Sequence, residues 1–297
     1  MNTKRQTKWF LIPYAAMALT MGSALVSFAA TGWAEENGEW VYYNNDGSKA
    51  TDVFKKSGNN WFYLDSDGIM AKNQLIEDDD NYFYVNSAGA MVTNQWRSIE
   101  NEDSGSDEPD EWWYYFQSNG KAVKKSGSSD NVKFVTLPTS TGQAKFTFDD
   151  EGHMLYGWID ESGEMLTDDD AWKSGMYYCS DNGDGRMATG WKYIPAVNDE
   201  DDDREGDGYW FYFSTNGKKT VDNDSKKING QYYGFDVNGK MLQGLYRIEF
   251  EANGKTIRSA EEIEDVDEIP DEDEDGVFVY YFGDSPKEGA MKTGTMT

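Results

Sequence analysis

Few side chains in this chain could carry out the chemistry of enzymes or metal sites. There is one histidine, His153, and one cysteine, Cys179. A zinc site needs His or Cys in sets, and a Ser-His-Asp triad would have to use His153, with no Gly-x-Ser-x-Gly motif around any serine. We therefore predict no catalytic residue and no zinc site. His153, beside Gly152, is interpreted as an exposed turn residue and Cys179 as a half-buried strand residue without a redox role.

Carboxylates are the one abundant reactive group, with 55 Asp and Glu residues. A glycosidase needs only two of them, but its acids sit in a cleft that tunes their pKa values, whereas most acids here lie in acidic runs. Residues 65–68 and 181–185 are dense in oxygen donors but lack the spacing of a calcium loop, so turn chemistry explains them first. We predict a chain that is not an enzyme and has no cofactor and no dedicated metal site. Weak, diffuse calcium binding by the acidic runs stays open, and a calorimetric titration would test it.

Aromatic residues recur at a fixed spacing, and this repeat decides the architecture. An aromatic triplet such as Trp61-Phe62-Tyr63 is followed by four or so polar residues, a glycine, Met or Ala, and then Gly-Trp or a variant of it. The turn glycines lie 21–22 or 31–33 residues apart, except for a last gap of 50. They are Gly47, Gly68, Gly89, Gly120, Gly152, Gly185, Gly217, Gly239 and Gly289. Such short units cannot bury a face alone and must stack on their neighbours.

The elements that this repeat predicts are short strands and tight turns. The triplet alternates on a strand, and residues that tolerate positive φ follow it, so we expect a hairpin turn at each glycine, with returning strands such as 69–72 and 187–191. The longer units carry acidic inserts at 101–111, 199–207 and 261–275, which would form one negatively charged edge if the units stack. The fold prediction is all-β: a repetitive solenoid of stacked β-hairpins with acidic loop inserts, about nine units over residues 31–297. No segment after residue 30 shows helical periodicity, and residues 133–170 are the least regular.

The first 30 residues are typical of a secretory signal peptide helix. Lys4, Arg5 and Lys8 precede an apolar stretch that ends in small residues, so we expect cleavage near Ala29 or Ala30, the alternative being an uncleaved anchor. No later segment is apolar enough to span a membrane. Loss of three cations changes the net charge from −28 to −31, which excludes nucleic-acid binding through phosphates. We expect a secreted protein.

The segments 31–33, 40–43 and 185–191 resemble the cell-wall-binding repeats of Gram-positive surface proteins, which include choline-binding and glucan-binding types. The resemblance covers nearly all of residues 31–297. It implies ligand pockets between successive hairpins, walled by the Trp of Gly-Trp, the first Trp of the triplet and the second aromatic residue of the next triplet. The residues that match are Trp191, Trp210 and Tyr233, then Trp33, Trp40 and Phe62, and then Trp96, Trp113 and Phe146. Packing in the solenoid core is the alternative role for each of them.

Three functions fit these observations. The first is a non-catalytic, cell-wall-associated protein whose partner is choline-bearing teichoic acid, held by many weak sites. The second is a glucan-binding module, and the third is an acidic stalk or adhesin that binds a basic partner. Free choline would compete for binding in the first case and soluble glucan in the second, and high salt alone would release the partner in the third. The chain stops at Thr297 without a further triplet, so we expect a fragment of a longer protein, the alternative being a homo-oligomer through the C-terminal hairpin.

Overall fold

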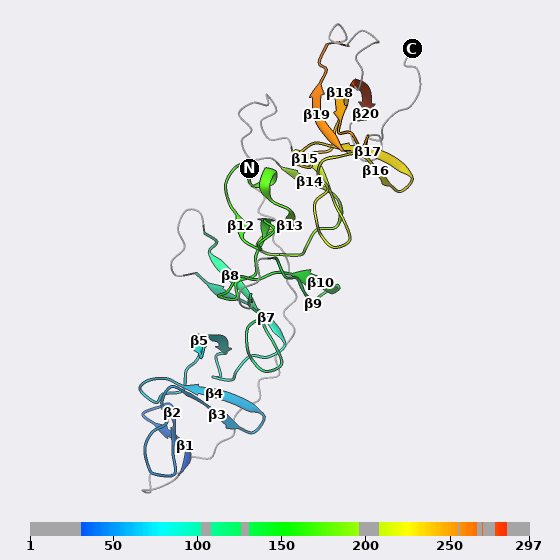
Figure 1. The fold of residues 1–297 in the computed structure, drawn as a ribbon. Coiled ribbons are helices and arrows are strands. Elements are labelled where there is room, and N and C mark those ends of the chain that lie inside the picture. The colour runs from blue at the N-terminus through cyan, green and yellow to red at the C-terminus, as the bar shows by residue number, and fades with distance from the viewer. Residues whose placement is uncertain are drawn as a thin grey trace, which may run out of the picture. The chain divides into compact units, whose positions relative to one another are not determined.

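Antiparallel hairpins make up almost all of the structure. The computed structural model describes residues 31–101, 108–125, 131–195, 208–254, 256–265, 269 and 277–283. The chain divides into unit 1 (residues up to 72, with 87–90) and unit 2 (residues 73–86 and 91 onward). Figure 1 shows the short separate hairpins of each unit. The all-β repetitive hairpin fold predicted from the sequence is confirmed.

Unit 1 consists of two hairpins, β1 (Gly32–Glu36) with β2 (Glu39–Tyr43) and β3 (Val53–Ser57) with β4 (Asn60–Leu64). The strands of unit 2 are β5 (Gln74–Asp78), β6 (Asn81–Val85), β7 (Gln95–Glu100), β8 (Glu111–Phe116), β9 (Val135–Thr139), β10 (Gly142–Phe146), β11 (Gly157–Ile159), β12 (Met165–Leu166), β13 (Tyr177–Cys179), β14 (Gly190–Pro195), β15 (Gly208–Phe213), β16 (Asn223–Ile228), β17 (Gln231–Phe235), β18 (Gly244–Phe250), β19 (Ile257–Glu262) and β20 (Val277–Phe282). Most of them pair two by two, while β12-β11-β13 and β19-β18-β20 form three-stranded sheets.

Two-residue turns connect the strands of the short hairpins. Asn37 and Gly38 between β1 and β2 have φ of 54° and 88°, and Asp79 and Asp80 between β5 and β6 have φ of 48° and 57°. Positive φ at both central residues is the geometry whose twist matches a β-hairpin, and Asn, Asp and Gly tolerate it best. These turns fix a register in which Trp33 pairs with Tyr42 across the strands.

A second turn, at the glycine of the repeat, follows each aromatic strand. The predicted turn glycines within the described residues all have positive φ, for example 73° at Gly68. The Asp65 carboxylate accepts the backbone N–H groups of Asp67 and Ile69, both at 2.9 Å, and so closes this turn. The pairing differs from the prediction, because the segment after the turn returns through a single bridge, such as Leu64 to Met70. The full ladder joins the aromatic strand to the Gly-Trp strand before it, so the inserts at 101–111 and 199–207 lie between the strands of one hairpin.

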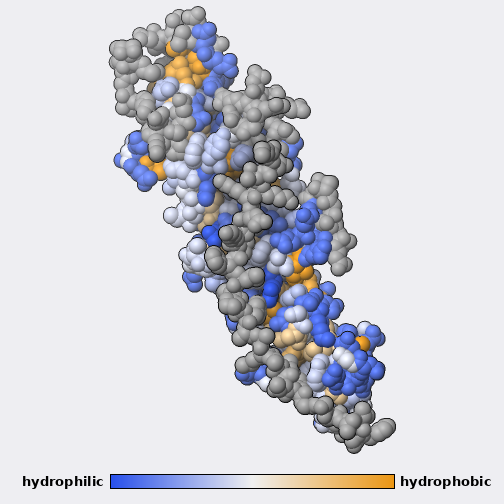
Figure 2. Space-filling view, turned by 180° about the vertical axis from the view of Figure 1, so that it is seen from behind, coloured by the Kyte–Doolittle hydropathy of each residue, from blue (hydrophilic) through white to orange (hydrophobic). Residues whose placement is uncertain are grey.

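The core is divided among many small clusters, each formed where one hairpin packs on the next. Alternate residues of the aromatic strands are buried, for example Phe62 and Leu64 on β4, because successive side chains of a strand point to opposite faces. In the view of Figure 2, hydrophobic residues are visible as separate patches among hydrophilic ones. Among the described residues, the six largest side chains that are fully buried are all phenylalanines.

One helical turn, α1 (Ala171–Ser174), interrupts this pattern, so the prediction of no helix after residue 30 is wrong at this point. A single turn is too short for helical periodicity to show in the sequence. The Gly175 N–H donates to the Ala171 carbonyl at 2.8 Å and so closes this turn. It lies in the stretch between β12 and β13, next to the region predicted to be least regular.

Several predictions fall outside the described residues. They are the signal peptide at 1–30, the turn at Gly289, the C-terminal hairpin end, and the acidic edge formed by inserts whose middle parts lie at 102–107, 196–207 and 270–276. Each stays a prediction. Within the residues that the structure describes, no helix is long and apolar enough to cross a membrane.

Candidate functional site

A backbone hydrogen bond links several of the hairpins to the one before them, at the second residue after the turn glycine. In unit 1 the N–H of Met70 donates to the carbonyl of Trp40 at 2.8 Å. In unit 2 the equivalent N–H of Met154 donates to Trp113, and that of Met241 to Trp210, both at 2.8 Å. This bond joins the aromatic strand of one hairpin to the segment that follows the aromatic strand of the next.

In unit 1 this linkage encloses an open pocket of about 210 Å³. Trp33 and Trp40 come from the first hairpin, and Phe62 and Met70 come from the second. Gly38, Lys72 and Ala88 complete the lining. The sequence predicted Trp33, Trp40 and Phe62 as one set, and the structure brings all three to this pocket.

The rings of this pocket meet edge to face. The centroids of Trp33 and Phe62 lie 5.4 Å apart at 74°, and Tyr42 contacts Trp33 at 5.5 Å and 83°. Edge-to-face pairs are favourable because the positive edge of one ring meets the negative face of another. The walls are therefore held by the core of the hairpin pair before any ligand enters.

The lysine that borders this pocket is paired with a carboxylate, and so is a second lysine of unit 1 that lies outside the lining. Lys72 Nζ lies 3.2 Å from Glu39 Oε2. Lys49 Nζ lies 2.6 Å from Glu36 Oε2, and this hydrogen bond, with a second one from Tyr43, lowers the pKa of the Glu36 carboxyl. The Lys72 ammonium thus carries its own counterion where it borders the pocket.

The set Trp191, Trp210 and Tyr233 is also brought together, in unit 2. The centroids of Trp191 and Tyr233 lie 4.8 Å apart at 62°. Trp210 packs against the same cluster, in which Tyr233 is buried and Met241 occupies the place that Met70 has in unit 1. Burial raises the pKa of the Tyr233 hydroxyl.

The third predicted set, Trp96, Trp113 and Phe146, has the same arrangement, but the neighbouring strand covers more of its rings. Trp96 and Phe146 lie 4.6 Å apart at 59°. Leu137 packs into this cluster, and the Trp96 indole donates to the Pro138 carbonyl at 2.9 Å. In all three sets the residues lie in one pocket or cluster, and the binding of a ligand there stays a prediction.

Sequence reasoning missed two further pairs of the same kind. Phe134 and Tyr177 lie 5.3 Å apart at 58°, and Trp158 and Phe211 lie 5.1 Å apart at 76°. It also missed the residue two places after each turn glycine, Met70 in unit 1, which completes the pocket wall. Counting from the turn glycine instead of from the aromatic triplet would have found these positions.

The other residues that the sequence analysis considered for chemistry have structural roles. The His153 ring stacks on Trp112 at 4.3 Å, and its Nδ1 lies 2.8 Å from Asp149 Oδ2, so the prediction of an exposed histidine is wrong. Cys179 is fully buried, more than predicted, and burial raises the pKa of its thiol to about 12. The donor-rich turn at Asp181 uses its carbonyl to accept the N–H groups of residues 184 and 185. Over the described part of the chain, no three His, Cys, Asp or Glu residues are placed to hold a metal ion.

Comparison with known proteins finds cell-wall-binding repeats in parts of this chain. The family model of the choline-binding repeat matches residues 30–67 and 54–96, and that of a cell wall binding repeat matches residues 113–122. No curated protein matches the chain. Among solved structures from Streptococcus pneumoniae, the chain is similar to the choline-binding domain of CbpL, with 21% identity over 80% of this chain and 100% of that one and a TM-score of 0.46.

The chain is also similar to two other pneumococcal structures. Choline binding protein F has 22% identity over 72% of this chain and 58% of that one, with a TM-score of 0.43. The choline binding domain of Spr1274 has 32% identity over 33% of this chain and 99% of that one, with a TM-score of 0.24. Since all three scores are below 0.5, we take no ligand position from these structures. Residues 30–96 carry choline-binding repeats, which confirms the predicted resemblance of this chain to cell-wall-binding repeat proteins.

Proposed function

We propose that this chain is a secreted, non-catalytic protein of the Gram-positive cell wall, and that its aromatic pockets bind the choline groups of teichoic acid. The observation that carries the proposal is the open pocket of unit 1, in which Trp33, Trp40, Phe62 and Met70 surround a cavity of about 210 Å³.

The chemistry of this lining suits a quaternary ammonium. Such a cation cannot donate a hydrogen bond, so facing π-clouds and apolar contact must hold it, each contact contributing on the order of 0.5–2 kcal/mol. Trp33 and Trp40 offer two indole rings and Met70 offers a polarizable thioether. The nearby Lys72 ammonium is paired with Glu39, which reduces its repulsion of a bound cation.

A sugar ligand, the second candidate, fits this pocket less well. Sugar rings stack on a broad, accessible aromatic face, whereas Trp33 and Phe62 meet at 74° and are held against the core. A compact cation can contact several inclined rings at once, but a flat sugar face cannot. The shape of the site therefore supports choline over glucan.

Charge also separates the candidate partners. The chain carries a net charge of −28, or −31 without residues 1–30, and teichoic acid is a polyanion, so the two repel at long range. Salt screens that repulsion, with a Debye length of about 10 Å at 0.1 M. We expect moderate salt to leave polymer binding intact or to strengthen it, whereas salt would release a basic protein partner.

The experiment is retention on a tertiary-amine resin, with elution by choline and by sodium chloride at the same concentration. We expect choline to release the protein where sodium chloride fails. Trp40→Phe, which keeps a π-face, should keep part of this choline-specific release, and Trp40→Leu, which keeps only apolar area, should lose much more of it. Equal release by both salts would contradict the proposal, and release by soluble glucan would favour the glucan-binding alternative.

A further inference from the structure

Lys219 stands at a repeat position where most of the other hairpins place an apolar residue. It is the second residue after the turn glycine Gly217, bridges to Phe213 as Met70 bridges to Leu64, and donates its N–H to the carbonyl of Met176 at 2.7 Å. Met70, Met154, Met187 and Met241 hold this register position in other hairpins, and Ala122 holds it after Gly120. The side chain of Lys219 therefore occupies, in its own pair of hairpins, the position that Met70 has in the pocket of unit 1.

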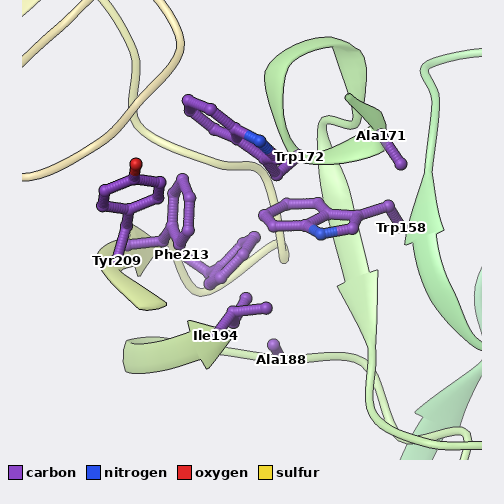
Figure 3. Packing of buried hydrophobic residues seen from close by; sticks show 8 residues of the cluster. Trp158, Ala171, Trp172, Ala188, Ile194, Tyr209 and Phe213 are labelled. Carbon is purple, nitrogen blue, oxygen red and sulfur yellow. The ribbon is translucent and has the colours of Figure 1, made fainter. Parts of the chain in front are cut away.

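Two rings beside Lys219 match rings of that pocket, while Met176 holds the position of Trp40. Trp158 occupies the place of Trp33, and Phe211 occupies the place of Phe62. Their centroids lie 5.1 Å apart at 76°, against 5.4 Å and 74° in unit 1. Figure 3 shows Trp158 and Trp172 on one side of this cluster, with Tyr209 and Phe213 opposite.

The ammonium group of Lys219 lies inside this aromatic set. Nζ is 5.0 Å from the ring centroid of Trp158 and 5.7 Å from that of Phe211, which is cation–π distance. It also donates to the carbonyl of Trp172 at 2.5 Å and to that of Lys173 at 3.3 Å. Only 3% of Lys219 is exposed, so a cation fills the space.

The helical turn α1 makes this burial tolerable. Carbonyl groups at the end of a helix have no partner within it, and those of Trp172 and Lys173 accept from the ammonium instead. Burial lowers the pKa of Lys219 to about 8, while the charge of Asp236 opposes that shift. At neutral pH the amine is thus still mainly protonated.

We propose that Lys219 is an internal ligand: its ammonium occupies the aromatic pocket of Trp158 and Phe211, and this pocket is closed to external quaternary ammonium ions. This inference rests on the proposed function for its choice of ligand. Replacing Lys219 by Met should open the pocket, since Met fits this register elsewhere. The trimethylammonium head of choline would then meet both rings, and its polarised methyl groups would face the carbonyls that Lys219 leaves.

The test is a calorimetric titration of the full chain and of Lys219→Met with choline chloride. We expect the variant to bind one more choline per chain than the wild type. Lys49→Met is the matched control, because Lys49 has the same place after a turn glycine but forms an ion pair with Glu36 and does not line the pocket. It should leave the stoichiometry unchanged.

Each outcome separates this inference from the proposed function. If the wild type binds choline and Lys219→Met adds no site, the inference fails and the proposed function stands. If only the variant binds, the open pockets are not choline sites and the inference stands. If neither binds, both are overturned for choline.

Two further measurements guard against a variant that does not fold. Met70→Lys makes the reciprocal change in unit 1 and should remove one choline site. In the unmodified wild type, an amine-reactive label read by peptide mass spectrometry should modify Lys219 at least about tenfold more slowly than the exposed Lys218. Equal rates would show that Lys219 does not occupy the pocket.

Discussion

Burial of the Lys219 ammonium predicts a specific dependence of stability on pH. In the native chain its pKa is about 8, against an ordinary value of 10.5 that applies once the chain unfolds. Between these values the unfolded chain binds more protons than the native one, so the free energy of unfolding rises with pH. Below pH 8 the native state bears the full cost of the buried charge, and above about pH 10.5 it bears none.

The size of the effect follows from the two pKa values. A difference of one unit corresponds to about 1.4 kcal/mol, so the whole shift corresponds to about 3.5 kcal/mol. Of this, roughly 2.5 kcal/mol is gained between pH 7 and pH 10. Lys219→Met has no amine at this place and should lack the gain. Other titrating groups, such as the tyrosines and Cys179, are common to both proteins and cancel in the difference between them.

The assay is urea unfolding at pH 7 and pH 10, followed by tryptophan fluorescence, for the wild type and for Lys219→Met. The wild type should gain roughly 2.5 kcal/mol relative to the variant on going from pH 7 to pH 10. Lys49→Met serves as a control that should show no such gain between pH 7 and pH 10. The hydrogen bond to Glu36 raises the pKa of Lys49, so that contribution is present below pH 10.5 and is lost only as pH rises through the native value. A wild-type difference that stays constant over this range would refute the burial of a charged Lys219.

Three other results should follow from the same structure. Gly120→Ala should destabilise the protein more than Gly47→Ala does in urea unfolding. Both glycines have φ above 80°, but a Cβ at Gly120 would lie 2.2 Å from a methionine sulfur, whereas a Cβ at Gly47 would have no atom within 4 Å. Equal losses would contradict the packing of the turn. Phe235→Ala, at a fully buried ring, should cost about 3–5 kcal/mol of unfolding free energy, while Tyr232→Ala, at a residue 42% exposed on the same strand, should cost about 1 kcal/mol or less. Cys179 should react with a thiol reagent only after unfolding, since it is buried and its thiol has a pKa of about 12, and rapid reaction in native buffer would count against this core.

The sequence predicts those parts of the fold that local chemistry determines. A glycine or asparagine at positive φ is a property of a four-residue turn, so the positions of Gly68 and its equivalents could be found without a structure. The aromatic sets, such as Trp33, Trp40 and Phe62, came from the resemblance to cell-wall-binding repeats. The structure brings them together because a similar backbone linkage recurs in several hairpins.

Strand pairing was harder to predict, because an aromatic strand has a turn on either side. Asn37-Gly38 and Gly47 are both good turns, and both are made. Which side carries the full ladder depends on the side chains across from the strand, as in the pairing of Trp33 with Tyr42. Periodicity along a single strand does not contain that information.

The role of Lys219 could not be read from its local sequence at all. Lys49 follows Gly47 as Lys219 follows Gly217, yet Lys49 is exposed in an ion pair and Lys219 is buried. The difference comes from α1, whose carbonyls lie more than 40 residues earlier in the chain, and from Trp158 in the preceding hairpin. A contact between segments so far apart leaves no mark on the spacing of residues around Lys219.

At the second residue after the turn glycine, the backbone and the side chain have separate roles. The backbone N–H of the residue links one hairpin to the previous one, and it does so in Lys219 as it does in Met70. The side chain lines the pocket, and it can change from thioether to ammonium without disturbing that link. Each hairpin contacts mainly its neighbours, so such a change affects one pocket and leaves the others as they are. A chain of this kind can therefore set the number of sites that engage a polymer, and with it the avidity, one side chain at a time.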